Sequence, residues 1–438
     1  MTVLANARIL TMDGPEIARG WLRLDGATIA ALGEGDAPDA PGQEVQDMGG
    51  DLILPGMVNP HGHLPMTLFR GLAEDVDDRL FRYILPLERA CVTEEVVRVG
   101  TRLALLESIR GGVTTVADMY YFEAAIAEEI AAAGLRGVPG QTVATFPAPD
   151  CGGIDEAFEL ASALADRWAG HPLVTPSIAP HAPYSTGPEV LARVARWADD
   201  HPGLPIQMHL AETEDEVAWA AREHGRSTVR IAEEAGVLRP GLVAAHCIYL
   251  DADDRDLLAR RGVGVAHCPR ANGKGGRAIA PVTDLRARGV PVGLATDGAM
   301  SGNTLDLFSQ FAPATIAQRI AGGTRAALPA REMLEMATAG GARVLGLGDR
   351  IGRLVPGYQA DLIRVSLSDP RQQPPYDVFA TLAFATLPSD VRGTMVAGRW
   401  LMRDGIVAEL DADRILADAR QVARTFGARI AEVDRGRP

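Results

Sequence analysis

Six residues that can bind a metal ion or move a proton each follow a short apolar run: His61, His63, His209, Glu212, His246 and Asp297. In an extended chain, residues i and i+2 point to the same side, so the imidazoles of His61 and His63 project together. Imidazole and carboxylate ligands suit zinc or iron(II), and such an ion lowers the pKa of a bound water toward ~7. Glu212 lies three residues beyond His209, where it is placed to transfer protons, and His246 is placed to orient or support the attacking hydroxide. The set predicts a metal-dependent hydrolase.

These residues need a fold that gathers strand ends, and the central part of the chain has the pattern of one. Between residues 55 and 356, short apolar runs alternate with longer amphipathic segments, as in βα units around a parallel sheet. One such segment starts after Thr93, a suitable N-cap, with Glu94 and Glu95 in its first turn. The eight apolar runs end near Asn59, Asp118, Val143, Pro180, His209, His246, Pro269 and Asp297. This predicts an α/β fold, a (β/α)8 TIM-like barrel with its catalytic groups at the C-terminal strand ends.

The two ends of the chain have a different texture. Residues 1–54 and 357–410 contain short β segments separated by turn signals, with no helical period. Each part alone has too few strands for a stable sheet, so we expect them to form one small β-sandwich domain together. Residues 411–438 carry a helical pattern, which predicts a C-terminal helix. We expect this helix to pack on the outside of the barrel. The barrel is expected to span residues 55–356.

Composition limits the classes of partner. The 438 residues are 47% hydrophobic, as in ordinary globular proteins, and 43 Lys and Arg against 57 Asp and Glu give a net charge of -14. This charge repels nucleic acid and anionic membranes. The start of the chain has no signal-peptide pattern, and no apolar run approaches ~18 residues, so we expect a cytoplasmic protein. The four cysteines form no CxxC pair, which excludes a disulfide framework or a cysteine-rich zinc site. A small molecule is the expected partner.

The segment from Pro55 to Gly71, together with the residues at the other strand ends, resembles the amidohydrolase superfamily. Within its single-metal branch, the segment is most similar to the methylthioadenosine/S-adenosylhomocysteine deaminases. The resemblance implies one divalent ion per chain, Zn²⁺ with Fe²⁺ as an alternative, and a homodimer or larger homo-oligomer. It also implies a role for each strand-end residue: His61, His63, His209 and Asp297 as metal ligands, Asp297 as acceptor of the water's proton, His246 as a support for the hydroxide, and Glu212 as the acid/base.

The same resemblance bears on the substrate. Glu88 lies where these deaminases carry a glutamate that binds ribose hydroxyls, and His181 matches a substrate-contacting histidine. Three positions differ: a usual tryptophan is Phe81, a usual arginine after strand three is Gln141, and a usual Asn-Leu-Lys-Leu segment becomes the glycine-rich residues 272–277. The glycine-rich segment lacks the Walker spacing of a phosphate loop and is expected to be a mobile lid. We therefore expect a pocket for a nucleoside whose specificity is altered.

Several functions agree with these residues. The leading expectation is hydrolytic deamination of an adenosine-type nucleoside with release of ammonia. Deamination of another ring (guanine-like, pterin or isocytosine) and hydrolysis of a triazine use the same metal site. Glu212 and His246 argue against halide release, because an amine must be protonated to leave and chloride need not be. An alternative from another class is a catalytically silent scaffold that keeps the barrel for assembly.

Overall fold

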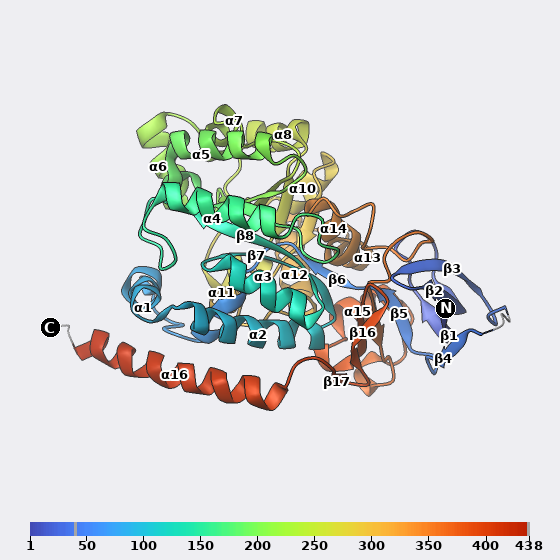
Figure 1. Cartoon of the computed structure of the whole chain (residues 1–438). Helices are drawn as coiled ribbons and strands as arrows, with labels where there is room; N and C mark the ends of the chain where they lie inside the picture. Colours follow the sequence, from blue (N-terminus) through green and yellow to red (C-terminus); the bar gives the residue numbers. More distant parts are fainter. Residues whose placement is uncertain (39–41, 436–438) are drawn as a thin grey trace.

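The computed structural model describes residues 1–38 and 42–435 and contains a near-closed barrel of eight parallel strands (Figure 1). The strands follow chain order around the barrel, from β6 to β13. Their bounds are β6 (Met57–Asn59), β7 (Val113–Tyr120), β8 (Arg136–Val143), β9 (Ser177–Pro180), β10 (Ile206–Leu210), β11 (Leu242–His246), β12 (Gly264–His267) and β13 (Val292–Leu294). Every residue of these strands is buried, as expected for a parallel sheet covered on both faces.

Helices cover the outside of the barrel and connect its strands. The helix at Glu94–Arg110 starts as predicted, because the side chain of Thr93 accepts a hydrogen bond from the backbone N–H of Val96. The α-helices are α1 (Leu85–Cys91), α2 (Glu94–Arg110), α3 (Glu123–Ala133), α4 (Ile154–Arg167), α5 (Pro183–Asp200), α6 (Glu214–His224), α7 (Thr228–Glu234), α8 (Ala252–Arg261), α9 (Pro269–Lys274), α10 (Val282–Ala287), α11 (Ala299–Gly302), α12 (Phe308–Gly322), α13 (Ala330–Glu335), α14 (Gly341–Val344), α15 (Val378–Phe384) and α16 (Ala412–Arg435).

Short helical turns complete the connections. Two of them, η1 (Leu64–Phe69) and η2 (Leu80–Ile84), follow the first barrel strand, and η3 (Met336–Gly340) runs directly into α14. At the seam between β6 and β13, a Cβ atom on Gly341 would lie only 2.7 Å from the carbonyl oxygen of Val58. Glycine therefore lets this turn approach the first strand closely. The remaining turns are η4 (Pro370–Gln372) and η5 (Pro388–Asp390).

Both ends of the chain build a separate mixed sheet of nine strands beside the barrel (Figure 1). β5 joins the two parts, because it pairs in parallel with β1 and antiparallel with β14. The strands are β1 (Thr2–Ile9), β2 (Ile17–Asp25), β3 (Thr28–Glu34), β4 (Glu44–Asp47), β5 (Leu52–Pro55), β14 (Leu362–Val365), β15 (Val391–Val396), β16 (Arg399–Arg403) and β17 (Ile406–Val407). This confirms the expected fold class of a TIM-like barrel plus a small β domain made from both ends of the chain.

The small sheet has its own core, which combines residues 4–53 with residues 354–395. We propose the limits 1–54 with 357–410 for this domain and 55–356 for the barrel, because that core draws on both ends. Residues 39–41 and 436–438, which fall in the first and last of the expected segments, lie outside the described residues.

The last helix, α16, runs along the outside of the barrel beside α2 (Figure 1). The ring of Phe426 on α16 packs against that of Phe69, with 4.9 Å between their centroids. Across residues 1–38 and 42–435, none of the helices combines the length and the apolar character that crossing a membrane requires.

Candidate active site

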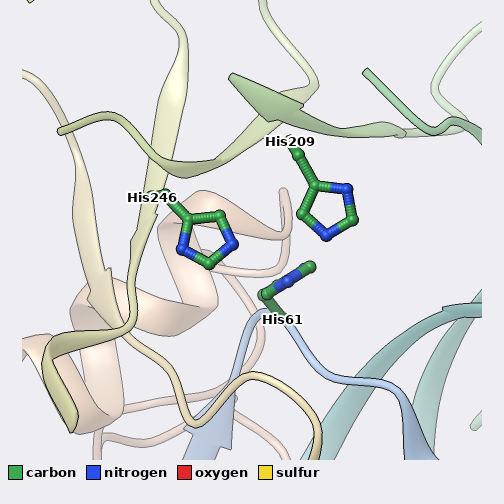
Figure 2. Close-up of side chains that lie close together, drawn as sticks. All are labelled: His61, His209 and His246. Atoms are coloured by element: carbon green, nitrogen blue, oxygen red, sulfur yellow. The ribbon is translucent and has the colours of Figure 1, made fainter. Parts of the chain in front are cut away.

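The strand ends bring the predicted histidines together at the C-terminal mouth of the barrel. His61 and His63 follow β6, His209 lies in β10 and His246 ends β11. Figure 2 shows the rings of His61, His209 and His246 pointing toward one another. The centroid of the His61 ring lies 5.0 Å from that of His209 and 5.5 Å from that of His246. The predicted strand-end convergence therefore places these imidazoles in one cluster.

Asp297, which follows β13, completes the cluster. Its Oδ1 atom lies 3.3 Å from Nε2 of His63 and 3.8 Å from Nε2 of His61, and it accepts a hydrogen bond of 2.6 Å from the backbone N–H of Gly298. Burial alone would raise the pKa of Asp297, but the hydrogen bond and charge of His63 hold that pKa well below its usual range. Burial opposes protonation of His63, yet Asp297 outweighs it and raises the pKa of His63 to about 9. The carboxylate is thus kept ionised.

Backbone carbonyl groups fix the orientation of two imidazoles. Nδ1 of His63 lies 2.6 Å from the carbonyl oxygen of Met119, and Nδ1 of His209 lies 2.9 Å from that of His181. Because a carbonyl oxygen only accepts, each Nδ1 carries a proton, and each Nε2 turns toward the centre of the cluster. A hydrogen bond from Nδ1 to a carbonyl oxygen is the usual support of a metal-binding histidine.

The free ring nitrogens fit a divalent cation. One ligand atom each from His61, His63 and Asp297 lie within 4.8 Å of one another, and the same holds for His61, His209 and His246. Nε2 of His61 is buried without a hydrogen-bond partner, and the Nε2 atoms of His63 and His209 face each other at 3.3 Å. Nε2 of His63, which carries a proton because the pKa of that ring is raised, donates to Nε2 of His209 at this distance, and a divalent cation bound here would replace that proton. Burial, reinforced by neighbouring imidazoles, also holds the pKa of His61 and His209 well below the usual value, which keeps both rings neutral.

The backbone at these strand ends is strained. Ala211, His246 and Asp297 have φ values of 51°, 72° and 62°, in the left-handed region that residues other than glycine avoid. Each such residue costs about 1–3 kcal/mol and persists where the surrounding structure and the function require it. The strain turns the chain directly after β10, β11 and β13, where the cluster lies.

Glu212 lies beside the cluster on the turn after β10. Its Oε1 atom is 3.5 Å from Nε2 of His246 and 2.8 Å from the guanidinium Nη1 of Arg277. The buried carboxylate of Glu216, on α6, accepts hydrogen bonds from the backbone N–H groups of Glu212 at 2.8 Å and Ala211 at 3.0 Å. Burial raises the pKa of Glu216 to about 7. Sequence reasoning missed Arg277 and Glu216. The signal for Glu216 was its place in the first turn of a helix capped by the preceding residue, Thr213.

A second pair of buried acids supports the turn after β6. Asp118, near the end of β7, accepts a hydrogen bond from the backbone N–H of Leu64, directly after His63. Glu123 lies against Asp118, and burial together with the charge of Asp118 raises the pKa of Glu123 well above its usual value. The apolar run before Asp118 was recognised in the sequence, but its role as a support for the His61–His63 segment was not.

The two expected nucleoside contacts lie on one side of the cluster. The ring of His181 is 4.9 Å from that of His209 and 5.2 Å from that of Phe146. Phe146 and Glu88 both line a small cavity of about 40 Å³. Glu88 accepts a hydrogen bond of 2.7 Å from the hydroxyl of Tyr120, and burial raises the pKa of Glu88 to about 7. The cluster and Glu88 are thus connected through His181 and Phe146.

Gln141 is not brought to this cluster. Its side-chain amide donates a hydrogen bond of 3.0 Å to Asp150 and lines a cavity of about 330 Å³ beside α3 and α4. A Cβ on the preceding residue, Gly140, would instead meet the side chains of Gln207 and Ser177. Because successive residues of a strand point to opposite faces, Gln141 faces the helices and not the barrel interior. Phe81, the other altered position, is 75% exposed.

Three comparisons with known proteins agree with this geometry. The amidohydrolase family matches residues 52–401. A 5-methylthioadenosine/S-adenosylhomocysteine deaminase from Syntrophobacter fumaroxidans is 42% identical over 430 residues, which cover 97% of this chain and 98% of the relative. The crystal structure of an adenosine deaminase from Xanthomonas campestris with bound zinc superposes with a TM-score of 0.95 at 32% identity, covering 98% of each chain.

A second solved structure shares the fold. Atrazine chlorohydrolase from Arthrobacter aurescens, also crystallised with zinc, superposes with a TM-score of 0.88 and covers 97% of this chain and 100% of that one. Its sequence is 23% identical, so this likeness shows the fold alone.

Proposed function

The chain belongs to the amidohydrolase family and is a hydrolytic deaminase, and from this premise we propose that it acts on adenosine-type nucleosides such as 5-methylthioadenosine and S-adenosylhomocysteine. The observation that carries the proposal is the contact of Glu212 with His246 beside the cluster of His61, His63, His209 and Asp297. This arrangement puts a proton donor next to a metal site. A catalytically silent scaffold has no need of it.

We propose that His61, His63, His209 and Asp297 hold one divalent ion, with zinc favoured because the adenosine deaminase relative was crystallised with zinc. When bound, the ion would supply a Lewis acid that activates water. Asp297 accepts a proton of the attacking water on its carboxylate, and His246 holds the water oxygen through Nε2. Glu212 protonates the ring nitrogen, then takes the hydroxyl proton of the tetrahedral carbon and passes it to the departing amine, so a C–O bond forms, a C–N bond breaks and ammonia leaves. The proton that Asp297 accepted restores the acid form of Glu212.

The nucleoside part of the proposal is supported by the position of Glu88 and His181. Both lie beside the cluster and flank the aromatic ring of Phe146, which offers an apolar face to a sugar or ring. A carboxylate near such a face can accept hydrogen bonds from two adjacent ribose hydroxyls. Gln141 faces α3 and α4, so we assign it no direct substrate contact.

A substrate panel tests the proposal directly. Ammonia release is measured for 5-methylthioadenosine, S-adenosylhomocysteine, adenosine, guanine, a pterin, isocytosine and an amino-triazine, with a chelated and remetallated sample beside each. We expect the adenosine derivatives to have the highest kcat/KM and the chelated enzyme to be inactive until a divalent ion is added. A faster reaction with guanine, pterin, isocytosine or triazine would overturn the substrate assignment, and full activity after chelation would overturn the metal requirement.

We also propose that the protein forms a homo-oligomer. Support comes from exposed apolar side chains on two neighbouring helices, α12 and α15, and just after them: Ile316, Ile320, Phe384 and Leu387, whose exposed fractions are 56%, 72%, 48% and 50%. Exposed apolar patches of this kind mark association surfaces. Light scattering is expected to give a dimer or larger species that dissociates in the Ile320→Asp variant. A monomeric wild-type protein would refute this proposal.

A further inference from the structure

The glycine-rich segment after β12, from Asn272 to Arg277, forms a loop whose ends are tied together. The backbone N–H of Arg277 donates a hydrogen bond of 3.0 Å to the carbonyl oxygen of Asn272. Residues 269–274 form the short helix α9, and the chain then turns at Gly276, whose φ is 65°. We call residues 272–277 the Asn272–Arg277 loop.

This loop contacts both of the residues assigned to proton transfer and water binding. At one end, Oδ1 of Asn272 lies 2.9 Å from Nδ1 of His246. At the other end, Nη1 of Arg277 lies 2.8 Å from Oε1 of Glu212, and the same Oε1 is 3.5 Å from Nε2 of His246. Asn272, His246, Glu212 and Arg277 therefore form a closed ring of polar contacts at the edge of the metal cluster.

The side chain of Arg277 passes close to the backbone of Gly275. A Cβ atom on Gly275 would lie 3.5 Å from both Cζ and Nε of Arg277, at ordinary contact distance. The guanidinium thus packs over the backbone of Gly275 on its way to Glu212. A longer side chain at that position would occupy the volume that the guanidinium uses.

Further contacts fix the loop on its outer side. The ammonium of Lys274 pairs with Glu74, which follows η1, and also donates a hydrogen bond to Asn303. After Arg277, the backbone N–H of Ala278 donates a hydrogen bond of 3.3 Å to the hydroxyl of Tyr249. The backbone on both sides of Arg277 is therefore fixed by contacts of Lys274 and Ala278, and this limits the positions that the guanidinium can take.

We propose that Arg277 is a positioning residue for Glu212 in the deamination proposed above. The ion pair fixes Oε1, the oxygen that also faces His246, and leaves Oε2 for the ring nitrogen of the substrate. Arg277 thus acts through Glu212 and does not touch the substrate. A carboxylate that rotates freely spends less time in the reactive geometry, and a misplacement of about 1 Å can lower the rate of reaction by ~10²-fold.

Kinetics of two variants test this inference, with whichever substrate the panel finds best. We expect Arg277→Ala to lower kcat by about tenfold to a hundredfold while KM changes by less than about threefold, because orientation and not binding is lost. Arg277→Lys retains an intermediate kcat, since a point charge replaces the planar fork. Added guanidinium ion at non-denaturing concentration restores part of the kcat of Arg277→Ala but does not change that of the wild type.

Gly275→Leu tests the path of the side chain without removing the charge. It is expected to lower kcat as Arg277→Ala does, and the double variant is expected to be no worse than either single variant. Lys274→Ala is the matched control, because it removes a cation of the same loop that pairs away from Glu212, and its kcat should stay within about twofold of wild type.

Other results would overturn the inference. A higher kcat in Arg277→Ala would mean that the contact between Arg277 and Glu212 is inhibitory. Equal losses of kcat in Arg277→Ala and Lys274→Ala would mean that Arg277 only stabilises the loop. If the losses of kcat in Gly275→Leu and Arg277→Ala added up in the double variant, the two substitutions would act independently, and Gly275→Leu would not act through Arg277. Failure of the proposed function is distinguished from these results, because it is read from the wild type alone: the adenosine derivatives would not be the best substrates, whatever the variants do.

Discussion

Glu212 contacts His246 and Arg277 but lies outside the two groups of residues whose ligand atoms converge. In the proposed mechanism its carboxylate transfers protons and is not needed to hold the proposed ion. This separation matters chemically, because an amine leaving a tetrahedral carbon is a strong base and must be protonated first. Metal binding and chemistry should respond separately to substitution at this position.

We predict that Glu212→Gln keeps its metal and loses turnover. A general acid/base typically contributes ~10²–10⁴-fold, so kcat should fall by that factor, a loss of about 3–5 kcal/mol in transition-state stabilisation. Metal content by elemental analysis and kcat on the best substrate are measured on the same sample. Intact metal with less than about a tenfold drop in kcat would remove Glu212 from the mechanism.

His61 and His63 supply half of the proposed ligands, so we predict that the His61→Ala/His63→Ala variant binds no ion. Their substitution leaves His209 and Asp297, too few ligands for a stable site in a protein that must compete with water. His181→Ala is the matched control, because only its backbone carbonyl supports His209 and its ring hydrogen-bonds with Ser185. Elemental analysis should find about one equivalent in the control; a full equivalent in the double variant would refute the ligand assignment.

At the scale of single residues, types and spacing predicted that these histidines and Asp297 converge, because the C-terminal ends of parallel barrel strands meet at one mouth of the barrel. They failed for Gln141, whose face of the strand depends on register: a shift of one residue reverses the direction of every side chain. They also failed for Arg277, whose contact with Glu212 depends on the conformation of a glycine-rich loop. No local pattern encodes that conformation.

Among the elements, the turn between β10 and α6 is supported by a single side chain, that of Glu216. The carboxylate of Glu216 accepts hydrogen bonds from the backbone N–H groups of Ala211 and Glu212. These bonds hold the left-handed bend at Ala211, which directs Glu212 toward the cluster. The supporting group is itself sensitive to pH, because burial raises the pKa of Glu216 from 4.5 to about 7.

The raised pKa has a predictable effect on stability. The folded protein binds the proton of Glu216 more tightly than the unfolded chain does. The contribution of this proton to the unfolding free energy is therefore complete below pH 4.5 and is lost as pH rises through about 7. Glu216→Gln removes the ionisation. We predict that the unfolding free energy of the variant, relative to wild type, rises by up to about 3 kcal/mol between about pH 5 and about pH 8. Denaturation at both pH values checks this, with Glu159→Gln, an exposed acid on α4, as control. A constant difference would contradict it.

The barrel strands were predictable as elements for a physical reason. The runs ending near Asn59, Val143, Pro180 and His246 match the ends of β6, β8, β9 and β11, because strands buried on both faces are rich in apolar residues. Strand β13 ends at Leu294, three residues before Asp297, since the chain leaves the sheet early to reach the left-handed bend. Short helical turns such as η2 and η3 carry no comparable signal and were not predicted.

In the whole molecule, the terminal sheet is joined directly to the strand that leads into the proposed metal site. β5 belongs to the sheet and β6 to the barrel, and Gly56 alone separates them. A Cβ on Gly56 would lie 2.2 Å from the side chain of Thr114, so the junction is tightly packed. His61 follows β6 by two residues. The position of the sheet therefore constrains where His61 and His63, the first two proposed ligands, enter the barrel.

We predict that deleting residues 1–50 abolishes cooperative unfolding and metal binding together. The deletion removes β1, the parallel partner of β5, and leaves an exposed edge beside the His61–His63 segment. Calorimetry and elemental analysis of the truncated protein are the measurements. A sharp melt with a full equivalent of metal would show that the barrel folds without the sheet.

A buried ion pair joins the two parts of the molecule at a second place. Arg136, which begins β8, donates hydrogen bonds from Nε at 2.9 Å and Nη2 at 3.2 Å to the carboxylate of Asp361, just before β14. Both side chains are 2% exposed, and Asp361 also accepts the backbone N–H of Ala397 at 2.8 Å. A planar guanidinium with two parallel hydrogen bonds fixes the angle between barrel and sheet as well as their separation.

Removing one partner of this ion pair should destabilise the protein more than removing both, because a buried charge without a partner has lost its hydration and gains nothing in return. We predict that Arg136→Met lowers the unfolding free energy by about 3–5 kcal/mol by leaving Asp361 unpaired, whereas Arg136→Met/Asp361→Leu recovers most of that loss. Urea denaturation of both variants provides the comparison. The exposed pair of Arg193 with Asp155 is the control, and its removal should cost less than about 1 kcal/mol. If the double variant is as unstable as Arg136→Met, the charges themselves, and not only their pairing, hold the barrel and the sheet together.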